Sequence, residues 1–434
     1  MQRHFIQVEG KDIHLRLSGK GFPLVMFHAS PSSSHMFEAL AGELQEHFTL
    51  IMPDTPGYGL SDPMSTHIEK IVDYIPTFRK LFSQLGLKQF AIYGSATGAQ
   101  LGIRYALSYP EQVKHLFLDN AAHFTDEQYK SIKDKYFPDL TPVYDGSHLS
   151  RMWTFVRDMF RYFPWFMRME ANKLSVPELP AIFYHSSAMD FLQAGKNYSL
   201  AYLAAFNHEH AKNVQGLRVK TSIFKHAASI ILPYIKQLTA HSFSETLVQI
   251  IDTPAAAVDR YTAMRQHMIG ALPIELNQHP LNIENAIPSR QKIFELEGKS
   301  LHAFVDIKGE GMPLALVAAP GESATVWESA MDTLMEGRPG IILSLPGQGD
   351  SDEWEEELGE EEEEVLVAEL MRKLGCPSFE LRQIPTNIPR IKIDPPDAQG
   401  IYMKKAWIEL REEYDVPAER LQLILRERLK YRGD

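Results

Sequence analysis

The stretch Tyr93-Gly94-Ser95-Ala96-Thr97-Gly98-Ala99 decides the fold of this 434-residue chain. The apolar run 90–93 predicts a buried strand, and the spacing of apolar residues over 99–107 predicts a helix. Glycines stand two residues before and two residues after Ala96, where a sharp turn between strand and helix would leave no room for side chains. The sequence therefore predicts a strand, a tight turn centred on Ala96 and a helix.

Strands and helices alternate on both sides of this turn. The other expected strands are 24–27, 50–52, 113–118, 218–224 and 247–251, and the other expected helices are 36–47, 71–85 and 257–268. Two further segments, 5–8 and 13–17, alternate around Gly10-Lys11 as in a hairpin. This order predicts an α/β fold with a doubly wound, mostly parallel sheet that follows an antiparallel hairpin.

Residues 126–213 interrupt the alternation with a helical pattern that is rich in aromatic residues. We expect a helical cap inserted into a core made of residues 1–125 and 214–285. Aromatic residues at helical spacing are typical of packing, and in a cap they also suit the wall of an apolar substrate cavity.

Two further motifs accompany the turn. His28-Ala-Ser-Pro31 follows the third expected strand, and Asp54-Thr-Pro-Gly-Tyr-Gly-Leu-Ser-Asp62 follows the fourth. With the glycine-flanked turn and the cap, these motifs make residues 5–270 resemble a cap-bearing member of the α/β-hydrolase superfamily. The resemblance implies the α/β-hydrolase fold, a nucleophile at position 96 and an ancestral activity on small ester or carbon-carbon bonds.

The position of that nucleophile is occupied by Ala96. A methyl group neither attacks a carbonyl nor holds a covalent intermediate, so we expect this chain to be inactive in covalent catalysis. Ser95 and Thr97 flank the position, but in such a turn their side chains diverge from that of residue 96, and we expect substrate contact from them instead. An engineered substitution and a natural loss of the nucleophile both fit the sequence.

The other catalytic residues implied by the resemblance are an acid after the sixth or seventh strand and a histidine after the eighth. Asp119 follows the sixth strand, where it would orient a histidine or cap the next turn. The segment 224–229 carries no acid, and Asp252-Thr-Pro254 stands where Gly-His is expected. We therefore expect no positioned general base, and an ordinary surface or core role for His123 and His267.

A pocket for a carbonyl, carboxylate or peroxide oxygen is expected to survive the loss of the nucleophile. Backbone N–H groups of Ala29 or Ser30 and of Thr97 would bind that oxygen. His28 beside them would either supply a hydrogen bond or support the loop. The expected ligand is a small apolar or acyl-type molecule.

A second part of the chain repeats the plan of the first. The segment 5–14 recurs as 294–302, and Pro56-Gly-Tyr-Gly-Leu-Ser-Asp62 recurs as Pro346-Gly-Gln-Gly-Asp-Ser-Asp352, at an offset of 288 to 290 residues. The counterpart of the turn in this second part has no such glycines. We therefore expect 290–434 to be a truncated, degenerate second copy that packs on the first copy or forms a homo-oligomer interface.

Three further pairs share an offset of 254 residues: Gly146 and Gly400, Trp153 and Trp407, Arg157 and Arg411. They place the pattern G-x6-W-x3-R at the start of one helix in each copy. Trp153 and Arg157 are candidates for substrate contact, with Arg157 facing an anionic group. Because the second copy lacks the turn, a packing role is the alternative that we favour.

The composition limits the remaining classes of function. The chain has 44 basic and 56 acidic side chains, a net charge of −12, which argues against a dedicated nucleic-acid binder. We find no run that suits a signal peptide or a bilayer span, and Cys376 is the sole cysteine, so we expect a cytoplasmic protein without a membrane partner. His208 and His210 point to different sides of any regular element, so we expect no metal and no cofactor.

These observations leave three hypotheses. The first is a capped hydrolase of small ester or carbon-carbon bonds that lacks its nucleophile. The second is a non-catalytic binding or scaffold protein in which the second copy forms an interface. The third is a cofactor-free lyase or oxygenase that uses His28 and the oxyanion pocket.

Overall fold

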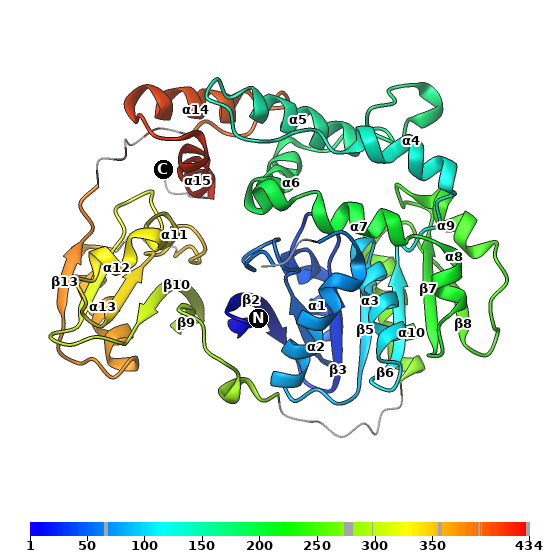
Figure 1. The fold of residues 1–434 in the computed structure, drawn as a ribbon, viewed down its shortest axis with the longest axis horizontal. Coiled ribbons are helices and arrows are strands. Elements are labelled where there is room, and N and C mark those ends of the chain that lie inside the picture. Colours follow the sequence, from blue (N-terminus) through cyan, green and yellow to red (C-terminus); the bar gives the residue numbers. More distant parts are fainter. Residues whose placement is uncertain are drawn as a thin grey trace. The chain divides into compact units, whose positions relative to one another are not determined.

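The computed structural model describes residues 1–430 except 65–67, 175, 273–280, 297, 355–357, 387, 389, 390 and 392. The described residues divide into two compact units. The first unit comprises 1–141 and 151–288, and the second comprises 142–150 and 289–434. Strands β1 to β8 belong to the first unit and β9 to β13 to the second (Figure 1).

The described residues of the first unit form an eight-stranded sheet in the order β1-β2-β4-β3-β5-β6-β7-β8. Its strands are β1 (Gln2–Val8), β2 (Lys11–Ser18), β3 (Phe22–Phe27), β4 (Phe48–Pro53), β5 (Phe90–Ser95), β6 (Val113–Asp119), β7 (Thr221–His226) and β8 (Val248–Thr253). β2 runs antiparallel to β1 and to β4, whereas β4, β3, β5, β6, β7 and β8 are parallel. The predicted doubly wound, mostly parallel sheet with an antiparallel hairpin is confirmed.

Helices cover both faces of this sheet. On one face, α1 (Glu38–Leu44) and α10 (Ala257–Ala271) contribute Leu40 and Met264 to a shared apolar core with the strands. On the other face lie α2 (Ile75–Gln84) and α3 (Thr97–Ser108), and Phe78 of α2 packs on Phe27 of β3 with ring centroids 4.7 Å apart. Two 3-10 turns, η1 (Ser34–Phe37) and η2 (Ile71–Tyr74), precede α1 and α2.

The turn between β5 and α3 is tighter than predicted. β5 continues to Ser95, because Ser95 still pairs with Asp119 of the neighbouring strand β6. α3 begins at Thr97. A single residue, Ala96, therefore joins the strand to the helix.

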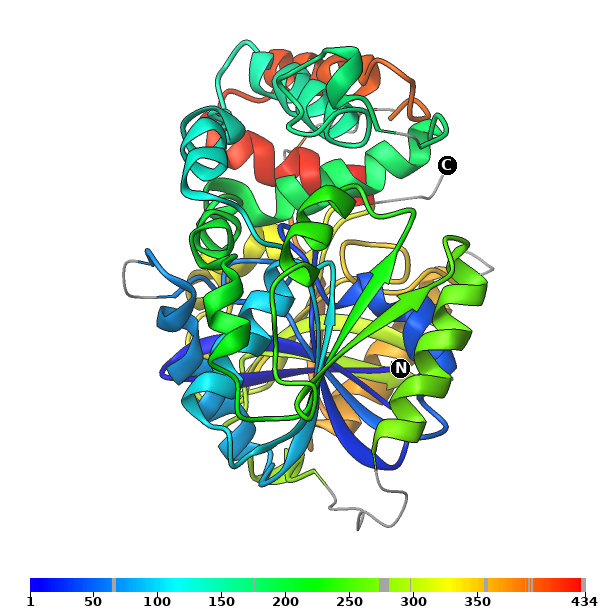
Figure 2. The ribbon, with the colours of Figure 1, turned by 90° about the vertical axis from the view of Figure 1, so that its right-hand side faces the viewer.

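The chain between β6 and β7 is helical. It contains α4 (Asp126–Tyr136), α5 (Ser147–Met159), α6 (Ala181–Ala194), α7 (Leu200–His208), α8 (Ala211–Gln215) and the short turns η3 (Glu170–Asn172) and η4 (Gly195–Asn197). α6 and α7 lie at the carboxyl end of the parallel strands (Figures 1 and 2). α9 (Leu232–Thr239) follows β7, and η5 (Ile283–Asn285) follows α10.

The described residues of the second unit form a five-stranded sheet in the order β13-β11-β12-β10-β9. Its elements are β9 (Gln291–Leu296), β10 (Lys299–Asp306), β11 (Leu314–Val317), α11 (Ala324–Trp327), η6 (Glu328–Ala330), α12 (Met331–Leu334), β12 (Gly340–Leu343), α13 (Glu360–Lys373), β13 (Glu380–Gln383), α14 (Ile401–Glu413) and α15 (Ala418–Lys430). β10 is antiparallel to β9 and β12, and β11 is parallel to β12 and β13. The order and directions match those of β1, β2, β4, β3 and β5.

Equivalent hydrogen bonds occur inside the two units. His14 N–H donates to Ser61 Oγ at 2.9 Å in the first unit. His302 N–H donates to Ser351 Oγ at 2.9 Å in the second unit. Both bonds tie the second strand of a sheet to the Pro-Gly-x-Gly-x-Ser-Asp segment, so the repeated sequence motif makes the same local contact in each unit.

The second glycine of the Pro-Gly-x-Gly-x-Ser-Asp segment lies beside a carboxylate in both units. The two carboxylates come from different places in the repeated sequence. In the first unit, a Cβ on Gly59 would lie 2.1 Å from Asp54 Oδ2. Ser344 occupies the position of Asp54 in the second unit, and there a Cβ on Gly349 would lie 3.0 Å from Glu427 Oε2. In the second unit, Glu427 of α15 thus supplies the carboxylate that Asp54 supplies in the first unit, because Ser344 has none.

Residues 142–150, which we predicted as part of the cap, group with the second unit instead. Trp407 Nε1 and Arg411 Nη1 of α14 donate to the carbonyl oxygen of Tyr144 at 3.0 and 3.2 Å. The rings of His148 and Trp407 pack with centroids 4.7 Å apart. These contacts hold a segment of the first half of the sequence to a helix of the second half.

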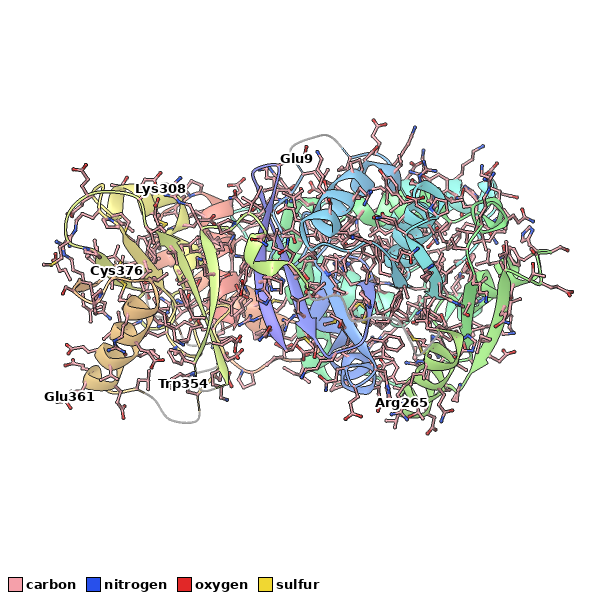
Figure 3. The ribbon with its side chains drawn as sticks, turned by 90° about the horizontal axis from the view of Figure 1, so that it is seen from below. Glu9, Arg265, Lys308, Trp354, Glu361 and Cys376 are labelled. Atoms are coloured by element: carbon pink, nitrogen blue, oxygen red, sulfur yellow. The ribbon has the colours of Figure 1, made fainter. Side chains whose placement is uncertain are left out.

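Two features bear on the cellular setting. Cys376 lies half-buried after α13 in the second unit (Figure 3), next to the apolar core of that unit. Among the described residues, no helix is long and apolar enough to cross a membrane. The cytoplasmic location stays a prediction.

Candidate active site

Ala96 has a strained backbone conformation, with φ 51° and ψ −112°. Its N–H donates to the carbonyl oxygen of Asp119 at 3.0 Å, and its own carbonyl accepts from Ala99 N–H at 2.9 Å. A positive φ costs a residue other than glycine about 1–3 kcal/mol, and such strain concentrates at functional sites. The neighbouring strand and helix hold the turn in place, and residue 96 lines a cavity.

The two flanking glycines are required by close backbone approaches. A Cβ on Gly94 would lie 2.3 Å from the carbonyl oxygen of Gly98, and a Cβ on Gly98 would lie 1.9 Å from that of Phe27. Neither oxygen belongs to a flexible side chain that is able to move away. The glycine spacing in the sequence therefore reflects how tightly β5, α3 and the end of β3 pack.

A cavity of about 500 Å³ opens at the carboxyl ends of β3, β5, β6 and β7 in the first unit. Ala96 lies on this edge of the sheet, and residues of α5, α6 and α7 face it. The wall is strongly aromatic and includes Phe124, Phe160, Phe163, Phe183, Phe191 and Phe206. Its size and apolar wall suit a small organic molecule.

Asp119 and His226 meet at the edge of this cavity. His226, the last residue of β7, lines the cavity, and its Nε2 lies 3.8 Å from Oδ1 of Asp119, the last residue of β6. Asp119 Oδ2 accepts a hydrogen bond from the Tyr93 hydroxyl at 2.9 Å and a longer one from Ser95 Oγ at 3.5 Å. Both residues are almost fully buried.

Burial shifts the titration of both members of this pair toward the neutral forms. Burial lowers the pKa of His226, although the nearby Asp119 carboxylate opposes the shift. Burial raises the pKa of Asp119 against the opposing effects of His226 and of the Tyr93 hydroxyl. His226 Nδ1 has no hydrogen-bond partner among the described residues. A neutral imidazole beside a carboxyl group is able to accept a proton, which is the property of a general base.

The expectation of no positioned general base left out His226, which the structure brings next to Asp119. We expected the acid after β6 or β7, with Asp119 as a candidate, and the histidine after β8, whereas the histidine beside Asp119 is His226, the last residue of β7. β6 and β7 are adjacent in the sheet, so their last residues meet. A histidine in the segment 224–229, at a strand end next to Asp119, was the signal available in the sequence.

His28 does not line the cavity among the described residues. Its side chain is fully buried, with Nδ1 hydrogen-bonded to the Ala29 carbonyl at 2.9 Å and Nε2 accepting from Thr55 N–H at 2.8 Å. Burial lowers the pKa of His28, in agreement with a neutral ring whose Nε2 is an acceptor. His28 supports the loop, and the lyase or oxygenase hypothesis loses the residue on which it depended.

The residues proposed for oxyanion binding lie together. Ala29, Ser30 and Thr97 all line the cavity with Ala96, and so does Ser95, which we expected to contact substrate. The N–H of Ala29 points at the sulfur of Met36, 3.3 Å away, a weak acceptor that a ligand oxygen would replace. Ser95 also contacts Asp119, as described above. Thr97 is the first residue of α3, where backbone N–H groups at the helix start suit an anionic oxygen.

Trp153 and Arg157, the two other substrate-contact candidates, are not among the described residues that line the cavity. Trp153 is 1% exposed and packs against the ring of Tyr184, with centroids 6.2 Å apart. Arg157 Nε donates to Asp158 Oδ1 at 3.1 Å. Packing, the alternative that we favoured, accounts for the contact of Trp153 with α6, whereas Arg157 pairs with its neighbour on the same helix.

The remaining histidines singled out in the sequence also lie apart from the described cavity wall. His208 Nδ1 is 2.9 Å from Gln100 Oε1, and His267 Nε2 is 2.8 Å from Ser222 Oγ. His123 packs against other histidine rings. These contacts fit the ordinary core or surface role that we expected.

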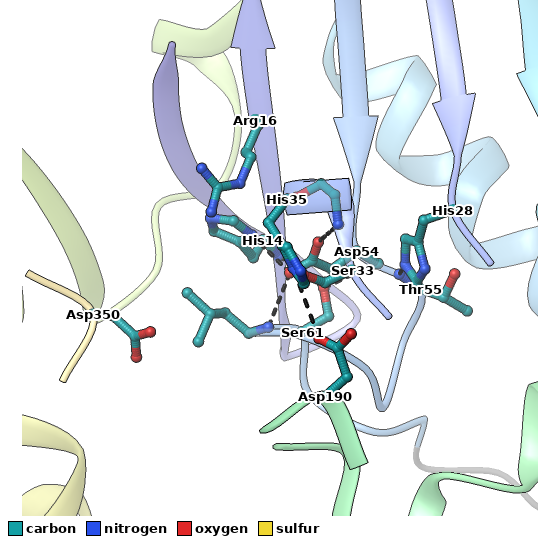
Figure 4. Close-up of polar contacts among 12 residues, drawn as sticks. His14, Arg16, His28, Ser33, His35, Asp54, Thr55, Ser61, Asp190 and Asp350 are labelled. Atoms are coloured by element: carbon teal, nitrogen blue, oxygen red, sulfur yellow. Dashed lines mark hydrogen bonds and ion pairs between the residues drawn. The ribbon is translucent and has the colours of Figure 1, made fainter. Parts of the chain in front are cut away.

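Asp54 braces the loop that follows β4 and does not line the cavity among the described residues (Figure 4). Its Oδ2 is 2.8 Å from His14 Nδ1, and its Oδ1 accepts from Ser34 N–H at 2.7 Å. Burial alone would raise the pKa of Asp54, but the charge and hydrogen bond of His14 hold it well below its usual value. The motif 54–62 therefore stabilises the rim of the site through a buried carboxylate.

Curated relatives match one part of the chain. The cis-3-alkyl-4-alkyloxetan-2-one decarboxylase of Shewanella oneidensis is 32% identical over 126 residues, which cover 28% of this chain and 40% of that protein. The soluble epoxide hydrolase of a Corynebacterium species is 30% identical over 115 residues, 26% of this chain and 40% of that protein. The chain thus spans about two fifths of the length of these relatives.

Comparison with solved structures and with family models covers more of the chain. A crystal structure of a hydrolase from Pseudomonas aeruginosa matches 62% of this chain and 96% of that chain, with 17% sequence identity and a TM-score of 0.45. A family model described as alpha/beta hydrolase fold matches residues 23–244, just over half of the chain. The chain therefore belongs to the alpha/beta hydrolase family.

Proposed function

We propose that the first unit is a hydrolase-derived binding site for a small, predominantly apolar carbonyl compound, and that Ala96 keeps it silent in covalent catalysis. The observation that carries the proposal is the position of the Ala96 methyl group. It stands on the strained turn, at the wall of an aromatic cavity, beside the proposed oxyanion residues. The site retains a place for the ligand but has no attacking atom there.

The experiment that tests this proposal restores a reactive side chain. Ala96→Ser and Ala96→Asp are assayed against short aryl esters and haloalkanes, and intact mass is measured for a covalent adduct. We expect turnover of at least one substrate class to rise about 10²-fold or more in one variant, because positioned nucleophiles and bases contribute effects of this size.

The matched control is Ala99→Ser, which introduces the same hydroxyl into α3 at a fully buried position outside the described cavity wall. It should remain as inactive as the native chain. Correctly folded Ala96→Ser and Ala96→Asp variants that form no adduct and turn over nothing would contradict the proposal.

A second candidate function is favoured by the Asp119–His226 pair. In it, the native chain hydrolyses an ester without an acyl-enzyme. The His226 imidazole takes one proton from water, the hydroxide attacks the ligand carbonyl, and the proton passes to the departing alkoxide. The acid and the alcohol are released, and the base returns to its neutral form.

Native turnover that disappears in His226→Asn and in Asp119→Asn would support this second function. The control is Lys225→Gln on the same strand as His226, which removes the 2.9 Å ion pair of Lys225 with Asp252 of β8. If the native chain shows no turnover with the ester panel, the second candidate is wrong.

We also propose that the second unit is a truncated second copy of the first unit with an architectural role. The matching strand order and the matching bonds of His14 and His302 support this. Between β13 and α14, the described residues contain no helix that corresponds to α3. Light scattering on the full chain tests the accompanying hypothesis of a homo-oligomer, which a monomeric mass at all concentrations would contradict.

A further inference from the structure

The wall of the cavity in the first unit is acidic as well as aromatic. The acidic residues Asp190 and Glu209 both line it. Among the described residues that line the cavity there is no lysine and no arginine. Its imidazoles are His35 and His226. The polar character of the wall therefore suits a positive group on a ligand and disfavours an anion deep in the cavity.

Glu209 is the exceptional member of this set. It is 5% exposed, and its Oε2 has no hydrogen-bond partner among the described residues. It follows the last residue of α7, and its carbonyl accepts from Phe124 N–H at 3.0 Å, which fixes the backbone that carries the side chain. An unpaired buried carboxyl group is costly to a fold, so such groups are commonly kept for a ligand or a reaction.

Within the part of the chain that the structure describes, no positive charge opposes the effect of burial on Glu209. The titratable side chains that interact with it are the phenols of Tyr136 and Tyr202, and His123 contacts its backbone. Burial raises the pKa of Glu209 to about 8. In the empty cavity at neutral pH the group is therefore mostly protonated, and a bound cation would favour its ionised form.

Asp190 provides an internal comparison. It lines the same cavity, but its Oδ1 lies 3.8 Å from His35 Nδ1 (Figure 4). Burial raises the pKa of Asp190 to about 6, with His35 opposing the shift. One acidic group of the cavity thus has a partner within the chain, whereas Glu209 has none among the described residues.

Aromatic rings complete the surroundings of Glu209. Tyr202 and Phe206 are stacked with centroids 5.3 Å apart, and Phe124 packs on Phe206 at 5.4 Å. All three rings line the cavity with Glu209. Aromatic faces attract ammonium groups, and the attraction strengthens where water is excluded. A carboxyl group among such rings is a suitable receptor for an amine attached to an apolar body.

We propose that the ligand of this cavity is an apolar amine, a molecule with a hydrocarbon or aryl body and a protonated amino group that binds to the carboxylate of Glu209. This inference rests on the proposed function, namely that the cavity binds a small, predominantly apolar carbonyl compound, and it adds a protonated amino group to that compound. A neutral ligand whose oxygen accepts a hydrogen bond from protonated Glu209 is the competing outcome.

The experiment measures binding to the full native chain by titration calorimetry. The probes are benzylamine, 2-phenylethylamine, 3-phenylpropylamine and 4-phenylbutylamine, each paired with the alcohol of the same length. We expect at least one amine to bind at least tenfold more tightly than its alcohol. At pH 7, titrations in two buffers of different ionisation enthalpy should show net release of close to one proton, because amine binding ionises Glu209.

Two variants assign the effect to one residue. Glu209→Gln keeps the size and polarity of the side chain and should abolish both the preference for the amine and the proton release. Asp190→Asn should retain both, since Asp190 has a partner in the chain. Thermal unfolding of each variant checks that it is folded.

The outcomes distinguish a failure of the amine inference from a failure of the proposed binding site. If amines and alcohols bind equally, or if Glu209→Gln keeps the preference, the amine inference is overturned and the binding site itself stands. If no probe of either kind binds, the amine inference is overturned, and the proposed function is judged separately by the Ala96→Ser and Ala96→Asp variants.

Discussion

His226 Nε2 lies 3.8 Å from Asp119 Oδ1, and the two residues end neighbouring strands of the central sheet. This contact places a carboxyl group next to an imidazole that lines the same cavity as Ala96. If a nucleophile is restored, the pair is the expected means of activating it.

The first prediction is that a nucleophile restored at position 96 depends on His226 for its activity. Ala96→Ser should gain esterase activity only while the pair is intact, so the double variant Ala96→Ser with His226→Asn should lose at least about 10²-fold in kcat/KM relative to Ala96→Ser alone. Steady-state kinetics with an aryl ester measures the difference. Combining Ala96→Ser with His267→Asn instead should leave the activity unchanged, and equal losses in both double variants would show a merely structural effect.

The strain at residue 96 predicts a gain in stability from glycine. Ala96→Gly should raise the free energy of unfolding by about 1 kcal/mol, because glycine adopts positive φ without the steric penalty of alanine. Ala106→Gly, in the interior of the following helix, should lower it by about 1 kcal/mol. Urea denaturation followed by tryptophan fluorescence checks both signs, and a destabilised Ala96→Gly variant would contradict the strain.

The close approach of Gly98 to the backbone of Phe27 predicts that a methyl group added at position 98 destabilises the protein. Gly98→Ala would place a Cβ 1.9 Å from the carbonyl oxygen of Phe27, and should destabilise the first unit by about 3 kcal/mol or more. Gly42→Ala is the control, since nothing lies within 4 Å of its added Cβ in α1, and it should stabilise by about 0.5–1 kcal/mol. Thermal melting of the two variants measures the contrast, which similar shifts for both would refute.

Substitution of Glu427, a buried carboxylate of the second unit, is predicted to loosen the structure around it. Glu427 is 1% exposed and accepts from Ser323 Oγ at 2.8 Å, and Lys430 Nζ lies 3.3 Å from its Oε1. Glu427→Ala removes the acceptor of the buried Ser323 hydroxyl and one of two partners of Lys430, which also pairs with Asp350 at 3.1 Å, and should cost about 3 kcal/mol. Hydrogen exchange of α11 and α15 should accelerate.

The control for this prediction is Glu419→Ala on the exposed side of the same helix, where we expect a change within about 0.5 kcal/mol. Unchanged exchange of α11 and α15 in Glu427→Ala would show that Glu427 does not hold α15 to the second unit.

A buried histidine predicts how stability depends on pH. Burial lowers the pKa of His115 to about 4 from an ordinary 6.5, and the charges of His267 and Lys220 act in the same direction. The unfolded chain takes up the proton first as the pH falls. The full stability is therefore present above about pH 6.5 and declines by up to about 3 kcal/mol as the pH approaches 4.

Denaturation at pH 7 and pH 5 measures this decline. His115→Asn should reduce the difference in unfolding free energy between the two pH values, whereas His47→Asn at an exposed position should not. An identical pH dependence in the native chain and in His115→Asn would contradict the assignment.

In the sheet core of the first unit, local sequence was sufficient to predict the order of the strands and of the helices α1, α2, α3 and α10, and the turn at Ala96. These features depend on apolar periodicity and on glycine spacing, which act over a few residues. The observed end of a strand differs from the predicted end where pairing with a neighbouring strand continues further along the chain. Ser95 at the end of β5, which pairs with Asp119 of β6, is an example. The family followed from the same local motifs, because they encode backbone geometry that the fold needs.

The site itself depends on contacts between residues far apart in the chain. His226 is separated from Asp119 by 107 residues of sequence, and only the adjacency of β6 and β7 brings them together. The same holds for Glu209, whose environment is apolar because α4 and α7 fold around it, and for residues 142–150, which α14 captures. The sequence by itself determined which elements form and that residue 96 has no reactive atom. Only the tertiary structure decided which charged groups share the cavity, because burial and long-range proximity arise when the chain packs.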